Sequence, residues 1–249
     1  MMGGAIEAGF WGAVAGSALV VGALIGYFLP VPQRLIAAVM AFGAGVLVSV
    51  LSFDLMDEAY RQGGFVATGA GFLFGALVYT GVNVYLSRRG AQHRKRSGDQ
   101  MARSGGSEVV IAAGALLDGI PESIVIGLSL LAGGAVSAVA VVGIFVSNIP
   151  EGLSSASGMR RAGWSAMQVV AVWTAIALIS GLAALLGYAI FGGLPIELVA
   201  AVTAVAAGGV LAMLADTMIP EAFEVAHEFT GLITVAGFLV AFVLSKLSA

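Results

Sequence analysis

Apolar segments long enough to cross a membrane follow one another along most of this chain. Only 10% of its 249 residues are charged and 59% are hydrophobic, whereas a water-soluble domain carries about 25% charged residues. A helix needs about 20 apolar residues to cross a bilayer. The sequence therefore predicts an all-α integral membrane protein. Its eight predicted membrane-spanning helices cover residues 7–29, 34–56, 64–86, 107–131, 135–158, 164–191, 196–219 and 229–247.

One hydrophilic stretch, residues 87–107, separates the third and fourth predicted helices. Its basic residues are Arg88, Arg89, Arg94, Lys95, Arg96 and Arg103. We interpret it as a solvated cytoplasmic loop, because loops rich in Lys and Arg stay on the cytoplasmic side of a membrane. With this loop inside, nine basic residues of the chain lie inside and two lie outside, and both termini lie outside. The predicted location is the plasma membrane or a bacterial inner membrane, as a multi-pass protein.

Two short polar motifs interrupt the fourth and fifth predicted helices. They are Asp118-Gly-Ile-Pro-Glu-Ser123 and Ser147-Asn-Ile-Pro-Glu-Gly152, and each places a glutamate directly after a proline. The four-residue spacing of Asp118 and Glu122 puts both on one helix face, and the same holds for Ser147 and Glu151. Because proline has no N–H, it also frees a backbone carbonyl of the preceding turn. Oxygen ligands of this kind suit a dehydrated cation, so the motifs predict a cation site.

A third element of this type, from Asp216 to Glu221, lies in the seventh predicted helix, where Pro220 precedes the glutamate. We include both acidic residues among the candidate ligands. The alternative is that acidic residues near helix ends are interfacial charges with no ligand role. For the carboxylates of the two central motifs, the alternative is that they tie helices together by interhelical hydrogen bonds. Several such carboxylates in adjacent spans are costly without a cation or proton, which favours the cation site.

The chain also contains internal repeats. Ile120-Pro-Glu122 recurs as Ile149-Pro-Glu151, and residues 45–60 align with residues 208–223. In each case the partners lie an odd number of predicted spans apart, so they run in opposite directions through the membrane. Inverted repeats of this kind are typical of transporters that bind their substrate at the repeat interface.

The paired proline–glutamate motifs, the eight predicted helices, the outside termini and the basic third loop resemble the ZIP (Zrt/Irt-like) family of divalent-metal transporters. The stretch Ser147-Asn-Ile-Pro-Glu-Gly152 is similar to the family motif. The resemblance implies a single transmembrane domain, residues 1–249, with a 3+2+3 arrangement of helices. Residues 1–86 and 164–249 would form three-helix repeats around central helices at 107–158, and residues 87–106 would form the cytoplasmic loop.

The same resemblance implies a metal site between the fourth and fifth helices. Glu122 and Glu151 would bridge metal ions, Asn148 would be a ligand, and Asp118 stands where the family usually has histidine. Gly119 stands where the family usually has asparagine, so one ligand of a second metal position is missing. The full set of candidate metal ligands is Asp118, Glu122, Ser147, Asn148, Glu151, Asp216 and Glu221.

We therefore expect a transporter that moves divalent cations of the zinc, manganese and iron class toward the cytoplasm by alternating access. Zinc, manganese, iron or cadmium ions would be substrates, and no prosthetic group, enzymatic activity or nucleic-acid partner is expected. A homodimer in the lipid bilayer is the assembly considered. One alternative is a cation or proton channel. Another is an intramembrane hydrolase with Asp118 and Asp216 as an acid–base pair, but no Gly-x-Gly-Asp motif or nucleophile elbow supports it.

Overall fold

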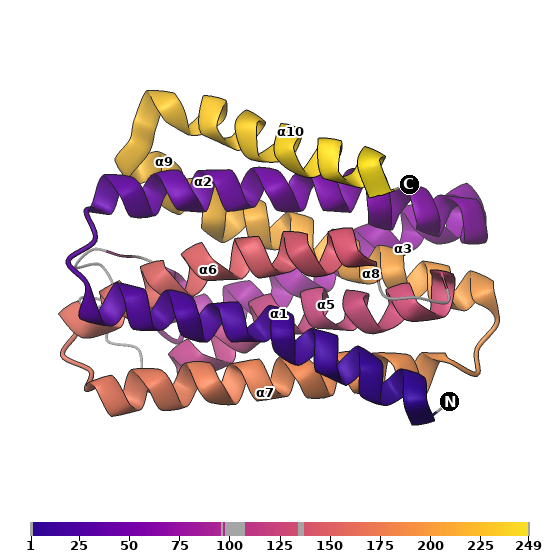
Figure 1. The fold of residues 1–249 in the computed structure, drawn as a ribbon, viewed down its shortest axis with the longest axis horizontal. Helices are drawn as coiled ribbons and strands as arrows, with labels where there is room; N and C mark the ends of the chain where they lie inside the picture. The colour runs from indigo at the N-terminus through magenta and orange to yellow at the C-terminus, as the bar shows by residue number, and fades with distance from the viewer. Residues whose placement is uncertain (1, 96, 98–107, 134–136, 249) are drawn as a thin grey trace.

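The computed structural model describes residues 2–95, 97, 108–133 and 137–248, and their regular structure is entirely helical (Figure 1). This confirms the predicted all-α class. Six helical segments of the described chain are long and apolar enough to cross a membrane, which is compatible with a multi-pass membrane protein. The elements are α1 (Met2–Phe28), α2 (Gln33–Val50), η1 (Leu51–Leu55), α3 (Met56–Ser87), η2 (Ala91–His93), α5 (Glu108–Gly133), α6 (Ala138–Arg161), α7 (Ala166–Phe191), α8 (Ile196–Met213), η3 (Leu214–Met218), α9 (Ile219–Ala226), η4 (His227–Phe229) and α10 (Thr230–Ser248).

Backbone breaks interrupt the two longest of these six segments. The segment Gln33–Ser87 contains Gly64 at φ 68° and ψ 178°, and the segment Ile196–Leu247 contains His227 at φ 45° and ψ −114°. Neither conformation is helical, and a positive φ costs glycine little because it has no Cβ. The first break coincides with the predicted start of the third span at residue 64. The second lies just before the predicted start of the eighth span at residue 229.

The repeat that pairs residue 45 with residue 208 is also visible in the structure. Continued along the chain, this alignment places the start of the π-helical turn η1 on the start of η3, and both turns have the same length. It also matches the start of α2 with the start of α8, and the break at Gly64 with the break at His227. A π-helical turn is rare and often marks a functional region of a helix. The two segments therefore share their irregularities as well as their sequence.

Small residues let the helices approach closely. A Cβ atom added at Gly45 of α2 would lie 1.9 Å from the carbonyl oxygen of Thr234 in α10, and one at Gly208 of α8 would lie 1.9 Å from that of Phe72 in α3. In the same way α1 packs on α6, where a Cβ at Gly22 would lie 2.1 Å from the oxygen of Ile149. Small residues at helix interfaces are typical of bundles that associate in lipid.

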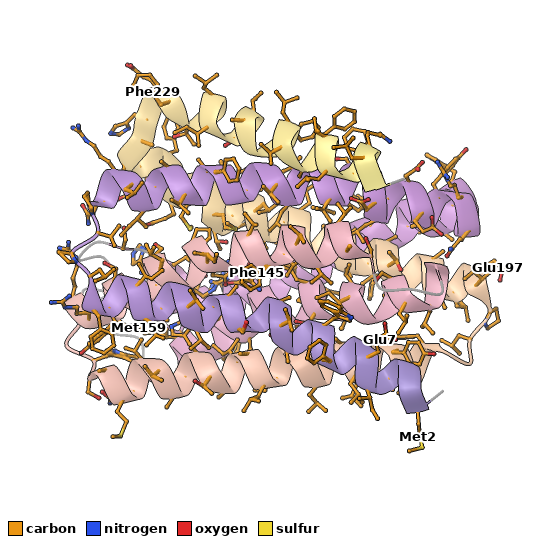
Figure 2. The ribbon with its side chains drawn as sticks, viewed as in Figure 1. Met2, Glu7, Phe145, Met159, Glu197 and Phe229 are labelled. Carbon is orange, nitrogen blue, oxygen red and sulfur yellow. The ribbon has the colours of Figure 1, made fainter. Side chains whose placement is uncertain are left out.

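The two motif helices lie in the middle of the bundle. Figure 1 shows α5 and α6 between the α2–α10 pair and α7, and α6 contacts both α1 and α2 while α5 contacts α7 and α8. Large apolar side chains project outward from the peripheral helices (Figure 2). Leu77 of α3 and Leu232 of α10, for example, have 71% and 70% of their surface exposed. The polar motifs are thus enclosed, and the outer faces are suited to lipid.

The close approach at Gly45 gives a stability prediction. Gly45→Ala should lower the free energy of unfolding by about 1–3 kcal/mol, because the added methyl group meets a backbone carbonyl that cannot move aside. Gly81→Ala is the matched control, since no atom lies within 4 Å of its added Cβ; helix propensity should make it neutral or slightly stabilising. Thermal unfolding in detergent measures both. Equal melting temperatures for the two variants would contradict the packing at Gly45.

Candidate functional site

Three carboxylates of the central motifs are buried between α5 and α6. Asp118 and Glu122 lie on α5 and Glu151 lies on α6, with exposed fractions of 1%, 2% and 3%. Pro121 and Pro150 lie inside these helices, as the sequence places them next to the glutamates. Burying three acidic groups is costly unless cations or protons accompany them. The structure provides two cations, and both come from outside the membrane-spanning helices.

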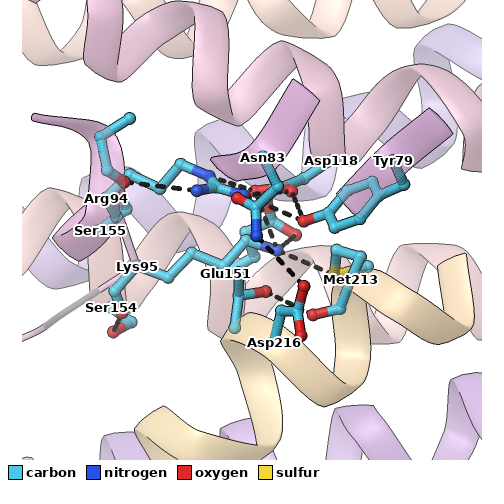
Figure 3. Close-up of polar contacts among 12 residues, drawn as sticks. Tyr79, Asn83, Arg94, Lys95, Asp118, Glu151, Ser154, Ser155, Met213 and Asp216 are labelled. Atoms are coloured by element: carbon cyan, nitrogen blue, oxygen red, sulfur yellow. Dashed lines mark hydrogen bonds and ion pairs between the residues drawn. The ribbon is translucent and has the colours of Figure 1, made fainter. Parts of the chain in front are cut away.

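Arg94 binds Asp118 through both carboxylate oxygens (Figure 3). Its Nε donates to Oδ2 at 2.8 Å and its Nη2 donates to Oδ1 at 2.8 Å. The hydroxyl of Tyr79 on α3 donates to Oδ1 at 2.6 Å and accepts from the guanidinium at 3.0 Å. Burial alone would lower the pKa of the Arg94 side chain, but the adjacent Asp118 carboxylate outweighs burial and raises this pKa above its ordinary value. Arg94 is therefore a fixed positive charge.

Lys95 joins the two motif helices. Its ammonium lies 3.0 Å from Oε2 of Glu151 and 3.4 Å from Oδ2 of Asp118, and it also contacts the sulfur of Met213 at 3.1 Å (Figure 3). Only 4% of the Lys95 side chain is exposed. One ammonium thus bridges carboxylates from α5 and α6, in the position where the sequence predicts a metal ion between these helices.

Arg94, Lys95 and Ser97 belong to one short stretch, called the basic segment below, and hydrogen bonds to its main chain hold it in place. The hydroxyl of Ser155 donates to the carbonyl of Arg94, and that of Ser154 donates to the carbonyl of Lys95 at 2.5 Å. Both serines closely follow the second motif along α6. The segment therefore docks on the helix that carries Glu151, and these two carbonyls are satisfied by neutral donors.

A further contact reaches α9. The N–H and the hydroxyl of Ser97 both donate to Oε1 of Glu221, at 2.9 and 3.1 Å. Glu221 was a candidate metal ligand, and 3% of its surface is exposed. In this structure Glu221 holds the basic segment.

The expectation of a solvated loop is wrong for Arg94 and Lys95, which are 2% and 4% exposed. Arg88 and Arg89 are exposed as expected, whereas Arg96 and Arg103 lie outside the described residues. One sequence signal bears on this insertion. Residues 108–159, which carry the motif carboxylates, contain no Lys or Arg, so any counter-cation must come from another part of the chain.

Glu122 differs from its two neighbours. It is one helical turn along α5 from Asp118, and neither of its carboxylate oxygens has a hydrogen-bond partner among the described residues. Glu122 also lines a small cavity whose other lining residues are apolar: Leu47, Val50, Leu55, Val125, Ile144 and Val210. A buried polar group without a partner carries a desolvation cost of about 1–3 kcal/mol or more. A bound cation would supply the missing partner, and a bound proton would remove the negative charge.

The remaining candidate ligands are only partly gathered. The Asn148 amide donates to the carbonyl of Ala15 at 3.0 Å, and the Ser147 hydroxyl donates to that of Ile144 at 2.9 Å. Asp216 lies in η3, is exposed, and accepts from Asn83 at 3.2 Å. The predicted set therefore comprises a buried group on α5 and α6, a carboxylate on α9 that binds Ser97, and an exposed aspartate that Figure 3 draws in the same group of polar contacts as Glu151.

Among the described residues, no three His, Cys, Asp or Glu side chains are arranged so that they could hold a metal ion. Asp118 and Glu151 bind Arg94 and Lys95, so in this arrangement their oxygens already have cationic partners. The oxygens of Glu122 have no hydrogen-bond partner among the described residues. Known protein-family models do not match the chain, and neither do curated proteins.

The ion pairs give a prediction about coupling between residues. Arg94→Gln and Asp118→Asn should each destabilise the protein by about 3–5 kcal/mol, because each leaves a buried charge without its partner. The double variant should lose about 2 kcal/mol less free energy of unfolding than the two single variants lose in sum.

The control for this double-mutant cycle is the exposed pair Arg61–Asp57. Its Nη2 and Oδ2 atoms are 2.8 Å apart, and the two side chains are 70% and 47% exposed. The corresponding cycle there should give a coupling below about 1 kcal/mol. Unfolding in detergent with a chemical denaturant measures both cycles. A buried coupling no larger than the surface one would contradict the docking of Arg94.

Proposed function

We propose that this chain is a ZIP-like transporter that carries divalent metal ions of the zinc, manganese and iron class toward the cytoplasm. The observation that carries the proposal is the group of buried carboxylates on two central helices, Asp118, Glu122 and Glu151. Acidic residues in membrane-length helices are rare and mark ion pathways, proton relays or substrate sites. Two cationic side chains already neutralise part of this group, which supports a site that suits positive charge.

The proposed ligands are the oxygens that these helices present. Glu122 and Glu151 supply charge from two different helices, Asp118 adds a third carboxylate, and Asn148 and Ser147 lie on the same helix as Glu151. Oxygen ligands of this type bind hard or intermediate divalent ions. The oxygens of Glu122 support this part of the proposal most directly, because they have no hydrogen-bond partner among the described residues.

We also propose that the chain crosses the membrane eight times in a 3+2+3 arrangement, with both termini outside. The breaks at Gly64 and His227 support a division of the two longest helical segments into two spans each. The matching positions of η1 and η3 and of these breaks support a repeat relation between the first three and the last three helices. Alternating access would then move one part of the bundle against another around the carboxylates.

The two glutamates give the principal test of transport. Glu122→Gln and Glu151→Gln should each reduce manganese or zinc uptake into proteoliposomes at least about 100-fold, because a neutral amide cannot offset the dehydration of a divalent ion. Glu197→Gln is the matched control, since Glu197 is exposed at the first turn of α8, and it should retain wild-type uptake. Uptake should saturate with metal concentration, as for a carrier and unlike a channel. Wild-type uptake by a folded Glu151→Gln protein would contradict the site.

Asp118 gives a test of metal preference. A third carboxylate in place of an imidazole makes the ligand set almost entirely oxygen, which favours manganese and ferrous iron relative to zinc. The wild type should therefore transport manganese or ferrous iron at rates comparable to zinc, and Asp118→His should shift the preference toward zinc. Competition between these metals for uptake measures the shift. Strong zinc preference in the wild type, unchanged in the variant, would contradict the role of Asp118.

A further inference from the structure

The basic segment at Arg94 and Lys95 occupies the space where the proposed metal site would be. It brings two positive charges to Asp118 and Glu151, through ion-pair and hydrogen-bond contacts between 2.8 and 3.4 Å. Both side chains are almost fully buried. A metal ion at these carboxylates and the two side chains would compete for the same oxygens. Binding of one therefore requires withdrawal of the other.

We infer that Arg94 and Lys95 are tethered counter-cations that close the site and select for divalent ions, because an entering ion must replace both of their charges. This inference rests on the proposed function and deepens it by assigning the residues that set the charge of the accepted ion. The segment would leave as a unit when a divalent ion binds Glu122, Glu151 and Asp118, and would return when the ion departs.

Charge balance is the basis of the selectivity. A divalent ion brings two positive charges, equal to those of the guanidinium and the ammonium that it replaces. A sodium or potassium ion brings one, so one of the buried carboxylates would lose its counter-charge. Leaving a buried charge unpaired is strongly unfavourable. The tethered cations therefore outcompete monovalent ions at these oxygens and lose only to an ion of higher charge.

The attachment of the segment suits reversible release. The carbonyls of Arg94 and Lys95 accept from neutral donors, the hydroxyls of Ser155 and Ser154, and these bonds are individually weaker than the ionic contacts. The N–H of Ser97 donates to the Glu221 carboxylate, which is not one of the three carboxylates that the entering ion binds. At its start, Gly90 adopts φ 105° and ψ 5° directly before η2. Changes of backbone angle at a few loop residues are the usual way in which a segment swings from a site. Once a metal ion neutralises the carboxylates, the ionic contacts no longer retain the side chains.

Glu122 gives the entering ion a first ligand. Its oxygens have no hydrogen bonds among the described residues while the basic segment is docked. An ion can therefore bind Glu122 before it displaces Lys95 from Glu151 and Arg94 from Asp118. The order of events, first binding and then release of the segment, follows from this difference between the three carboxylates.

A single cysteine reports on the position of the segment. The chain contains no cysteine, and Ser97 is 2% exposed beside Glu221, so Ser97→Cys introduces one protected thiol of similar size. In detergent with a metal chelator, its reaction with a maleimide should be slow. Manganese should accelerate labelling by about tenfold, typical of a coupling between two sites, and sodium at equal ionic strength should not. Adding Glu122→Gln and Glu151→Gln should abolish the acceleration.

Uptake measurements on the same proteins separate this inference from the proposed function. Arg94→Gln with Lys95→Gln, added to Ser97→Cys, should make maleimide labelling fast without metal, and it should let potassium compete with manganese for uptake. Arg88→Gln, an exposed change in the same loop, should behave as wild type in both measurements. If the wild type transports manganese but labelling at position 97 does not respond to it, the inference is overturned and the transport function stands. If the wild type neither binds nor transports any divalent ion, both are overturned.

Discussion

The pairing of buried carboxylates with cations from a loop is the interaction on which the centre of this protein depends. Asp118 and Glu151 lie on adjacent helices, and their charges are met by Arg94 and Lys95 at 2.8 to 3.4 Å. Without these cations, the acidic groups would face one another across an apolar interior at a large electrostatic cost. The position of the loop and the packing of α5 against α6 are therefore linked. An ion that binds Asp118 and Glu151 must displace the loop cations from them.

The bundle that surrounds the site is closely packed. Backbones approach closely at two repeat-related glycines, Gly45 of α2 and Gly208 of α8. A Cβ atom added at either would lie 1.9 Å from a carbonyl oxygen of the neighbouring helix, that of Thr234 or that of Phe72. The π-helical turns η1 and η3 occur at matching positions of the two related segments. Such turns locally break the regular helix, so they are places where a segment can bend while its ends stay packed. The two related segments are thus interrupted at equivalent points.

Much of the fold could be predicted from the sequence, because long apolar runs and their polar breaks reflect strong local constraints. The helix starts near residues 34, 64 and 196 and the positions of both proline–glutamate motifs agree with the structure. The docking of Arg94 and Lys95 could not be read in this way. A run of basic and small polar residues has no apolar periodicity, and it resembles a solvated loop whether or not two of its side chains enter the bundle. The contacts of Asp216 with Asn83 and of Glu221 with Ser97 also depend on tertiary packing that the motif spacing does not encode.

The central claim is that Asp118, Glu122 and Glu151 form a cation site that the loop cations share with a metal ion. Anomalous diffraction from crystals of the transport-competent protein grown with manganese tests it most directly. The account predicts an anomalous peak within bonding distance of Glu122 and Glu151, with the ammonium of Lys95 moved away from the 3.0 Å contact that it makes with Glu151 here. Manganese bound elsewhere, with Lys95 still on Glu151 and Arg94 still on Asp118, would contradict it.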